Sequence, residues 1–140
     1  MRIVLDTNVV VAALRSPSGA SAALVEQALN RRFKLLLSVP LVLEYEAICG
    51  DPAQRIVSGL SESEVETVVS ALCTVGAPVR SRFLWRPQLR DPADEMVLEA
   101  AVNGMADAIV SFNTRDFGNV QHAFGIAVLS PREALRRMAG

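Results

Sequence analysis

The chain has 140 residues, of which 51% are hydrophobic and 21% charged, a composition typical of a globular protein and not of a disordered one. Its net charge is −1 and its pI about 5.8, so no overall positive field attracts nucleic acid, and any such binding requires a local patch. The longest apolar stretches, such as 35–43, have about nine residues, which is too short for a membrane span.

The N-terminal third alternates strand and helix patterns. A branched apolar run at 2–6 predicts a buried parallel strand, residues 20–30 predict a helix, and residues 34–37 predict a second strand. Asp6 and Asn8 interrupt the apolar stretch that a secretory signal would need, so we expect a cytoplasmic location.

Clear start and stop signals delimit the central helices. A helix is expected over 38–49 and is ended by the Gly-Asp-Pro sequence at 50–52. A second helix is expected over 61–74, where Ser61 and Glu64 have the spacing of a capping box.

The last part of the chain continues the alternation. Strands are expected at 78–84, 106–111 and 125–130, with a helix that starts at the N-cap Asp91 and another with a capping box that starts at Ser130. Strands and helices alternate from end to end, so we predict the α/β class, a mainly parallel sheet and one domain over 1–140.

The reactive residues are few. His122 is the single histidine, and we interpret it as a surface or packing residue, since zinc hydrolases use several His or Cys ligands. Cys49 and Cys73 have no metal-site spacing, and we interpret them as small core residues. An enzyme with this inventory would use carboxylates or a metal-bound water as its acids and bases.

Two acids lie where the ligands of parallel sheets bind, beyond the carboxyl ends of the strands. Asp6 ends the first predicted strand; an Asp here often caps the next helix, but Asn8 can do that alone, which leaves Asp6 for another role. Asp94 lies in the first turn of its helix, where an acid also favours the helix dipole, and capping alone explains Asp91.

Glu44 lies in the middle of a helix, on a face that it shares with Leu41, Tyr45 and Ile48. An unpaired carboxylate on an apolar face is unfavourable, so Glu44 is either functional or paired in a salt bridge at the edge of that face. Glu46 lies on another face and is expected to be solvated.

Asn113 and Asp116 follow the fourth predicted strand, where each alone could be a turn residue, whereas Asp107 lies at the opposite edge. Four carboxylates therefore fall near one edge of the predicted sheet: Asp6, Glu44, Asp94 and Asp116. Converging carboxylates repel unless a proton or a cation lies between them, and oxygen ligands suit Mg²⁺ or Mn²⁺. Such a site can orient a water, lower its pKa and stabilise pentacoordinate phosphorus.

Three segments resemble the PIN-domain family, close to the VapC-type toxins of toxin–antitoxin pairs: LDTNV at 5–9, SVPLVLEYEAI at 38–48 and the stretch at 91–117. The resemblance implies a three-layer α/β/α fold with four or five mainly parallel strands, and metal-dependent RNA cleavage that leaves a 3′-hydroxyl. It also implies that Asp6, Glu44 and Asp94 are the first three catalytic and metal-binding acids.

The fourth acidic position of the family is altered. Many PIN domains have Asp where this chain has Asn113, and the nearby acid is Asp116, so either residue could fill the position. We expect one tightly held ion before substrate arrives. The polar residues expected to surround and position the acids are Thr7, Asn8, Asp91, Ser111 and Asn113.

An arginine-rich segment over 80–90 directly precedes the Asp91 cap and contains no acid. Its basic residues are Arg80, Arg82, Arg86 and Arg90, and Trp85 lies between them. One interpretation is binding of the RNA backbone, with the indole stacking on a base. The other is an edge strand protected by charge.

The leading hypothesis is a Mg²⁺- or Mn²⁺-dependent ribonuclease, the toxin of a toxin–antitoxin pair, with RNA as substrate, a cognate antitoxin as inhibitor and a homodimer or larger assembly. The alternative is a catalytically weak PIN-like module that binds RNA or a partner, which Asn113 favours. A phosphatase with a DxD nucleophile is disfavoured because Asn8 occupies the second Asp position, and the glycine turn of a Rossmann dehydrogenase is absent from the sequence.

Overall fold

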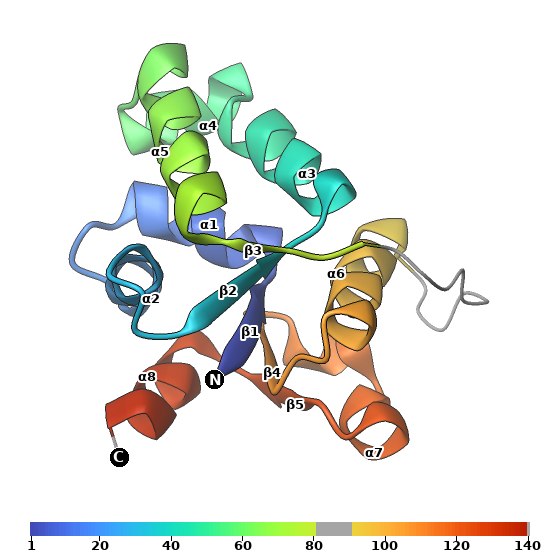
Figure 1. Cartoon of the computed structure of the whole chain (residues 1–140). Helices are drawn as coiled ribbons and strands as arrows, with labels where there is room; N and C mark the ends of the chain where they lie inside the picture. Colours follow the sequence, from blue (N-terminus) through green and yellow to red (C-terminus); the bar gives the residue numbers. More distant parts are fainter. Residues whose placement is uncertain (81–90, 140) are drawn as a thin grey trace.

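The computed structural model describes residues 1–80 and 91–139. Within them, parallel strands form one sheet in the order β3-β2-β1-β4-β5 (Figure 1). The strands are β1 (Arg2–Leu5), β2 (Lys34–Leu37), β3 (Ala77–Pro78), β4 (Ala108–Val110) and β5 (Ala127–Leu129). The prediction of a mainly parallel α/β sheet is confirmed. The third strand lies earlier than the predicted 78–84, of which residues 81–84 are outside the described part.

Helices cover both faces of the sheet, which gives the three layers expected. In Figure 1, α1, α2 and α8 lie on one side and α6 and α7 on the other, while α3 packs against α1, α5 and α6. The helical elements are α1 (Thr7–Arg15), α2 (Ala20–Leu29), α3 (Val39–Cys49), α4 (Pro52–Ser58), α5 (Glu62–Val75), α6 (Pro92–Asn103), the 3₁₀-helix η1 (Thr114–Phe117), α7 (Val120–Phe124) and α8 (Pro131–Ala139). No helix in the described ranges is long and apolar enough to cross a membrane.

The strand order reverses between β1 and β4. From β1 the chain moves outward through β2 to β3, and it then returns to place β4 on the other side of β1. Such a reversal opens a crevice at the carboxyl ends of the two central strands, and this crevice is the usual ligand site of open α/β sheets. The residues that directly follow β1 and β4, Asp6 and Ser111, therefore occupy the position most suited to function.

The central strands form the core because they are covered on both faces. The side chains of Ile3, Val4 and Leu5 are fully buried, as are those of Ile109 and Val110 on the neighbouring strand. Strands with apolar residues on both faces are typical of parallel sheets, so the continuous apolar runs in the sequence predicted these strands correctly.

Helix starts follow the predicted capping chemistry. Ser61 and Glu64 form a reciprocal capping box with bonds of 3.0 and 3.1 Å, and Ser130 and Glu133 form a second one with bonds of 3.1 and 3.2 Å. The Asp91 carboxylate accepts a backbone N–H of α6 at 2.9 Å. These contacts involve residues close in sequence, which is why the sequence predicted them.

Two expectations about individual residues are wrong. Asn8 does not cap α1, since the helix begins at Thr7 and places Asn8 in its first turn. The end of α3 at the Gly-Asp-Pro sequence is confirmed, but the Asp51 carboxylate also caps a further helix, α4, that was not predicted. Cys73 is exposed and so is not a core residue, because Leu72 occupies the buried stripe of α5 beside it. Cys49 is buried and His122 is exposed, as expected.

One buried hydrogen bond connects α3 to the end of β1. The Tyr45 side chain is fully buried, and its hydroxyl donates to the backbone carbonyl of Leu5, the residue before Asp6. Burial raises the pKa of this phenol well above its ordinary value, so the hydroxyl remains a donor at all moderate pH values. The contact fixes the helix that carries Glu44 relative to the strand that precedes Asp6.

We expect Tyr45→Phe to lower the free energy of unfolding by about 1–2 kcal/mol, because it keeps the ring but removes the donor to a buried carbonyl. Urea unfolding monitored by circular dichroism measures the change. Phe117, which is also fully buried, offers a control for ring packing through Phe117→Leu. Equal stability of Tyr45→Phe and the wild type would show that the hydrogen bond contributes nothing.

Candidate active site

The predicted acids line one pocket at the carboxyl ends of β1 and β4. This carboxylate pocket has a volume of about 480 Å³. Its acidic members are Asp6, Glu44, Asp91, Asp94 and Asp116, and the polar residues Thr7, Asn8 and Asn113 also line it. Asp6 and Asp94 are buried, Glu44 is half-buried, and Asp91 and Asp116 are exposed. Asp107 lies at the opposite edge, as expected, where its carboxylate accepts the backbone N–H of Arg2 at 2.7 Å.

Ser111 holds the Asp6 carboxylate. The Ser111 hydroxyl donates to Asp6 Oδ2 at 2.6 Å, and its oxygen accepts the Asn113 backbone N–H at 2.9 Å and the Asn8 amide at 3.4 Å. Asn8 Oδ1 in turn accepts the backbone N–H of Phe112 at 3.4 Å. This network joins α1 to the end of β4. The Asn8 side chain takes part in it and does not cap the helix.

The Asp6 carboxylate is buried and makes no capping hydrogen bond to α1. Burial raises its pKa above the ordinary value, and the negative charge of Asp116 raises it further. The hydrogen bond from Ser111 and the nearby backbone N–H groups of Thr7 and Asn8 lower the pKa, but burial is the larger effect. Asp6 is therefore held at the N-cap position of α1 as a poorly solvated acid, with Ser111 as the side chain that binds its carboxylate.

Asp94 faces the same pocket from the first turn of α6. Its side chain is buried, and its pKa is raised to about 6. Burial is the largest cause, followed by the negative charges of Asp6, Asp91, Asp116 and Glu95. Asp6, Asp91 and Asp116 also line the carboxylate pocket, so these negative charges lie on one surface of the molecule.

The two glutamates of α3 lie on different faces of the helix, as expected. Glu44 is half-buried and lines the carboxylate pocket, whereas Glu46 is exposed and lies at a separate hollow between α3 and α5. The Tyr45 anchor between them sets the rotation of the helix, since its hydroxyl can reach Leu5 from one face only. In the described part of the chain, Glu44 has no salt bridge of the kind that the alternative interpretation required.

Asn113 and Asp116 both line the carboxylate pocket. Asn113 contributes its backbone N–H to Ser111, while Asp116 lies in η1 and its charge raises the pKa values of Asp6 and Asp94. The structure therefore brings both candidates for the fourth position to the lining of the pocket.

Two pocket residues were missed by the sequence analysis. Arg15 ends α1 on the face that also carries Asn8, and Gln54 reaches the pocket from α4. Gln54 Oε1 accepts two hydrogen bonds from the Arg15 guanidinium, at 3.0 Å from Nε and 2.5 Å from a terminal nitrogen. Within the described ranges Arg15 forms no direct ion pair, although five acids line the same pocket. Arg15 could have been found from its helical spacing to Asn8, which places both residues on one face of α1. Gln54 could not, because α4 was not predicted.

The arginine-rich segment is mostly outside the described residues. Arg80 is exposed at the end of the described first part. Arg82, Trp85, Arg86 and Arg90 lie in the stretch that the structure does not describe, so RNA binding by this segment stays a prediction.

The residues of the carboxylate pocket offer only oxygen ligands to a cation. Among residues 1–80 and 91–139, no three His, Cys, Asp or Glu side chains lie close enough to form a ready-made metal site. Mg²⁺ commonly uses one or two carboxylates and keeps several waters, so it does not require three protein ligands that are already in place. A cation bound among these acids would reduce the part of the rise in the Asp94 pKa that comes from neighbouring negative charges.

The sequence profile of the PIN domain family matches residues 2–115, well over half of the chain. The chain belongs to the PIN domain family. Members of this family are generally nucleases, and the three-layer sheet with its acidic pocket is a nuclease-type PIN fold. Comparisons with curated proteins and with solved structures gave no significant match. The PIN match includes Asp6, Glu44 and Asp94 and ends one residue before Asp116.

The raised pKa of Asp94 predicts how stability depends on pH in a metal-free buffer. Between the ordinary value of 3.8 and about 6, the folded state binds a proton that the unfolded state has released. The free energy of unfolding therefore falls as the pH rises through this window and stays reduced above it. We expect Asp94→Asn to raise stability at pH 7.5 by about 1 kcal/mol, a value discounted for solvent screening in the open pocket, and to flatten the fall.

Urea unfolding at pH 4.5, 6 and 7.5 in a chelator measures this effect. Glu46→Gln is the control, because it removes an exposed carboxylate outside the pocket. If Asp94→Asn and the wild type are equally stable at pH 7.5, Asp94 does not experience the repulsion described.

Proposed function

We propose that this PIN domain protein is a metal-dependent ribonuclease that hydrolyses RNA phosphodiester bonds in the carboxylate pocket. The observation that supports this most directly is the pair of buried acids, Asp6 and Asp94, that face one pocket from different elements. Folding brings these like charges together at an energetic cost, which is understandable if a cation and a phosphate bind there.

The residues proposed to hold Mg²⁺ or Mn²⁺ are Asp6 and Asp94, with Glu44 and Asp116 at the rim. The ion would supply a lowered pKa for a bound water and stabilise the negative charge that develops on the phosphoryl oxygens. The chain's own contribution is to keep these oxygens in place. Ser111 binds Asp6 and is itself bound by the Asn8 amide, and the Tyr45 anchor holds the helix of Glu44.

The reaction forms one bond and breaks one bond at phosphorus. The water oxygen attacks phosphorus, and a pocket carboxylate accepts the water proton. The P–O3′ bond then breaks, and O3′ takes up a proton from solvent, which gives a 3′-hydroxyl and a 5′-phosphate. Among the described residues that line this pocket, Arg15 is the one with a positively charged side chain. Gln54 orients its guanidinium through hydrogen bonds and carries no charge. We assign it the role of binding a non-bridging oxygen of the phosphate, for which a guanidinium is well suited.

The biological role proposed is that of a VapC-type toxin. An antitoxin of the pair would block the carboxylate pocket and could present an arginine to its acids, and the toxin would act in the cytoplasm as a homodimer or larger assembly. A short reading frame directly upstream that encodes a DNA-binding protein would support this role. A catalytically weak RNA- or partner-binding module is the second candidate, and it is favoured by the neutral Asn113 in a pocket position where many PIN domains have Asp.

We expect Asp6→Asn and Asp94→Asn each to reduce kcat/KM for RNA by about 10²-fold or more without loss of fold. Glu44→Gln and Glu46→Gln form a matched pair on one helix, and only the first change should reduce cleavage strongly. The assay follows a labelled oligoribonucleotide in millimolar Mn²⁺, with circular dichroism to confirm folding. Full cleavage by purified Asp6→Asn would refute the assignment, and an inactive wild type would favour the binding module.

Metal should also stabilise the folded protein. At 100 times its dissociation constant, an ion that binds only the folded state adds about 2.7 kcal/mol, which corresponds to a rise of several degrees in Tm. The rise should be smaller at pH 5.5 than at pH 7.5, because a protonated Asp94 cannot bind the ion. Asp6→Asn should melt above the wild type in chelator and gain less from Mn²⁺. Equal gains for both proteins would show that Asp6 is not a ligand.

A further inference from the structure

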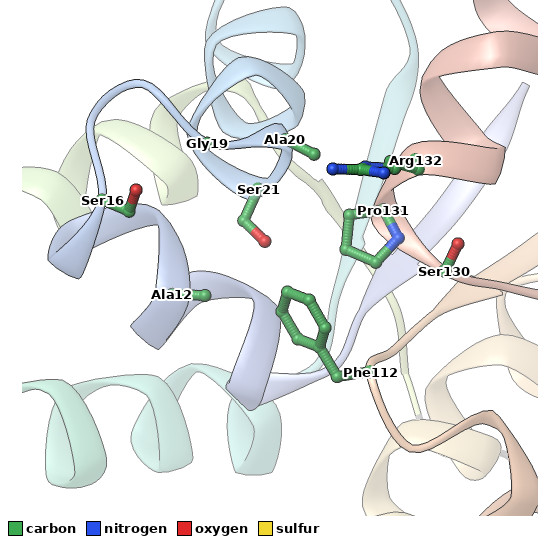
Figure 2. A pocket seen from close by; sticks show the side chains of 9 residues that line it. All are labelled: Ala12, Ser16, Gly19, Ala20, Ser21, Phe112, Ser130, Pro131 and Arg132. Atoms are coloured by element: carbon green, nitrogen blue, oxygen red, sulfur yellow. The ribbon is translucent and has the colours of Figure 1, made fainter.

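A second pocket lies beside the carboxylate pocket, between α1, the start of α2 and the start of α8 (Figure 2). This α2–α8 pocket has a volume of about 330 Å³, near the lower end of ordinary ligand sites. Its polar lining includes Ser21, Ser130 and Arg132. Ala12 and Phe112 line both pockets, so the two are adjacent along one surface.

The start of α2 is suited to bind an anion. The helix has ten residues, its N-cap is Gly19, no side chain caps it, and its first turn contains no acid. The first backbone N–H groups of a helix have no partner within the helix, and the helix dipole adds partial positive charge there. By contrast, the start of α8 is already closed by its capping box.

Ser21 provides independent support for a ligand at this place. Its residue is 3% exposed, and its Oγ has no hydrogen-bond partner among the described residues. Figure 2 shows this oxygen pointing into the space between Phe112 and Pro131, inside the pocket. A buried hydroxyl without a partner is unfavourable, and a polar ligand group in the pocket would supply one.

Arg132 adds a positive charge without a partner. The residue is exposed, and within the described part of the chain its guanidinium makes no hydrogen bond or ion pair. Figure 2 shows its side chain extending from the start of α8 toward Ala20 at the start of α2. The neighbouring acid Glu133 is engaged with Ser130 in the capping box. A guanidinium, free backbone N–H groups and a hydroxyl together form a set of donors that suits a phosphate.

Phe112 connects this set of donors to the carboxylate pocket. Its side chain is 54% exposed although it is aromatic, and it directly follows Ser111 at the end of β4. An exposed aromatic ring that lines both pockets is suited to stack on a nucleic acid base.

We propose that the α2–α8 pocket binds a backbone phosphate of the single-stranded RNA substrate, on one side of the phosphodiester cleaved in the carboxylate pocket. Arg132, Ser21 and the start of α2 bind this phosphate, and Phe112 stacks on the base between the two pockets. The inference rests on the proposed ribonuclease function and extends it with a subsite. Ser130 and Arg132 lie beyond the 2–115 match to the PIN family, so part of this subsite comes from the C-terminal region of this chain.

The test measures the binding of a fluorescent RNA octamer by anisotropy, in a chelator so that the RNA stays intact. Arg132→Gln should raise Kd about fivefold or more and reduce the slope of log K against log salt by about 0.7, the value for one lost contact to a single strand. Arg136→Gln is the matched control, since Arg136 is an exposed arginine of the same helix outside the pocket, and it should change Kd less than about twofold. Ser21→Ala should raise Kd without lowering Tm.

Equal effects of Arg132→Gln and Arg136→Gln would overturn the proposal, since they would indicate general charge attraction. An unchanged Kd for both Arg132→Gln and Ser21→Ala would overturn it too, even if Asp6→Asn and Asp94→Asn abolish cleavage. Adenosine 5′-monophosphate serves as a competitor, and binding of this nucleotide as tight as that of the octamer would overturn the assignment to an RNA strand. Loss of octamer binding in Arg132→Gln would support the subsite even if no cleavage were found.

Discussion

The structure depends on a constraint that opposes folding: two carboxylates are buried next to each other where the strand order reverses. Asp6 follows β1, Asp94 opens α6, and each has a raised pKa because burial and neighbouring negative charges disfavour its ionised form. A fold tolerates this arrangement only if other contacts hold the surrounding elements in place. Here those contacts are the buried apolar residues of β1 and β4, which surround the acids on the sheet side.

The polar contacts next to the acids fix the positions of the carboxylates but add no positive charge beside them. Ser111 gives Asp6 one short hydrogen bond, and the same hydroxyl oxygen accepts bonds from Asn8 and from the backbone of Asn113. Tyr45 fixes α3 to the strand end through an uncharged donor. Because none of these groups carries positive charge, they orient the acids without offsetting the burial and repulsion that raise the acids' pKa values, and a bound cation would supply the missing positive charge. Asn8 takes part in this network and does not cap the helix, so it does not leave Asp6 unexplained in the way expected from the sequence, and a functional role for Asp6 stays a prediction.

Features that depend on residues close together in the sequence could be predicted, whereas features that depend on the packing of distant segments could not. The parallel strands, the capping boxes at Ser61 and Ser130, and the Asp91 cap depend on neighbours in sequence, and the structure confirms them. The convergence of Asp6 and Asp94 followed from the rule that parallel strands present their carboxyl ends at one edge. Gln54 and the α2–α8 pocket could not be predicted, because they depend on how separate helices pack, and α4 was mistaken for a simple helix end.

The same electrostatics explains why cations should flank an acidic site. The chain has a net charge of −1, and a pocket of five carboxylates repels the phosphates of RNA more strongly than the chain as a whole does. A divalent ion reduces this repulsion at the reacting phosphate but not along the rest of the strand. Arg15 on one side of the carboxylate pocket and Arg132 beyond Phe112 place single positive charges near the adjoining path, and neither is neutralised by an acid in the described residues. The attraction is therefore local. An RNA strand gains these contacts only when one phosphate lies at the acids and other phosphates lie at the two arginines. The arrangement therefore fixes where the strand binds and does not merely attract a negatively charged polymer.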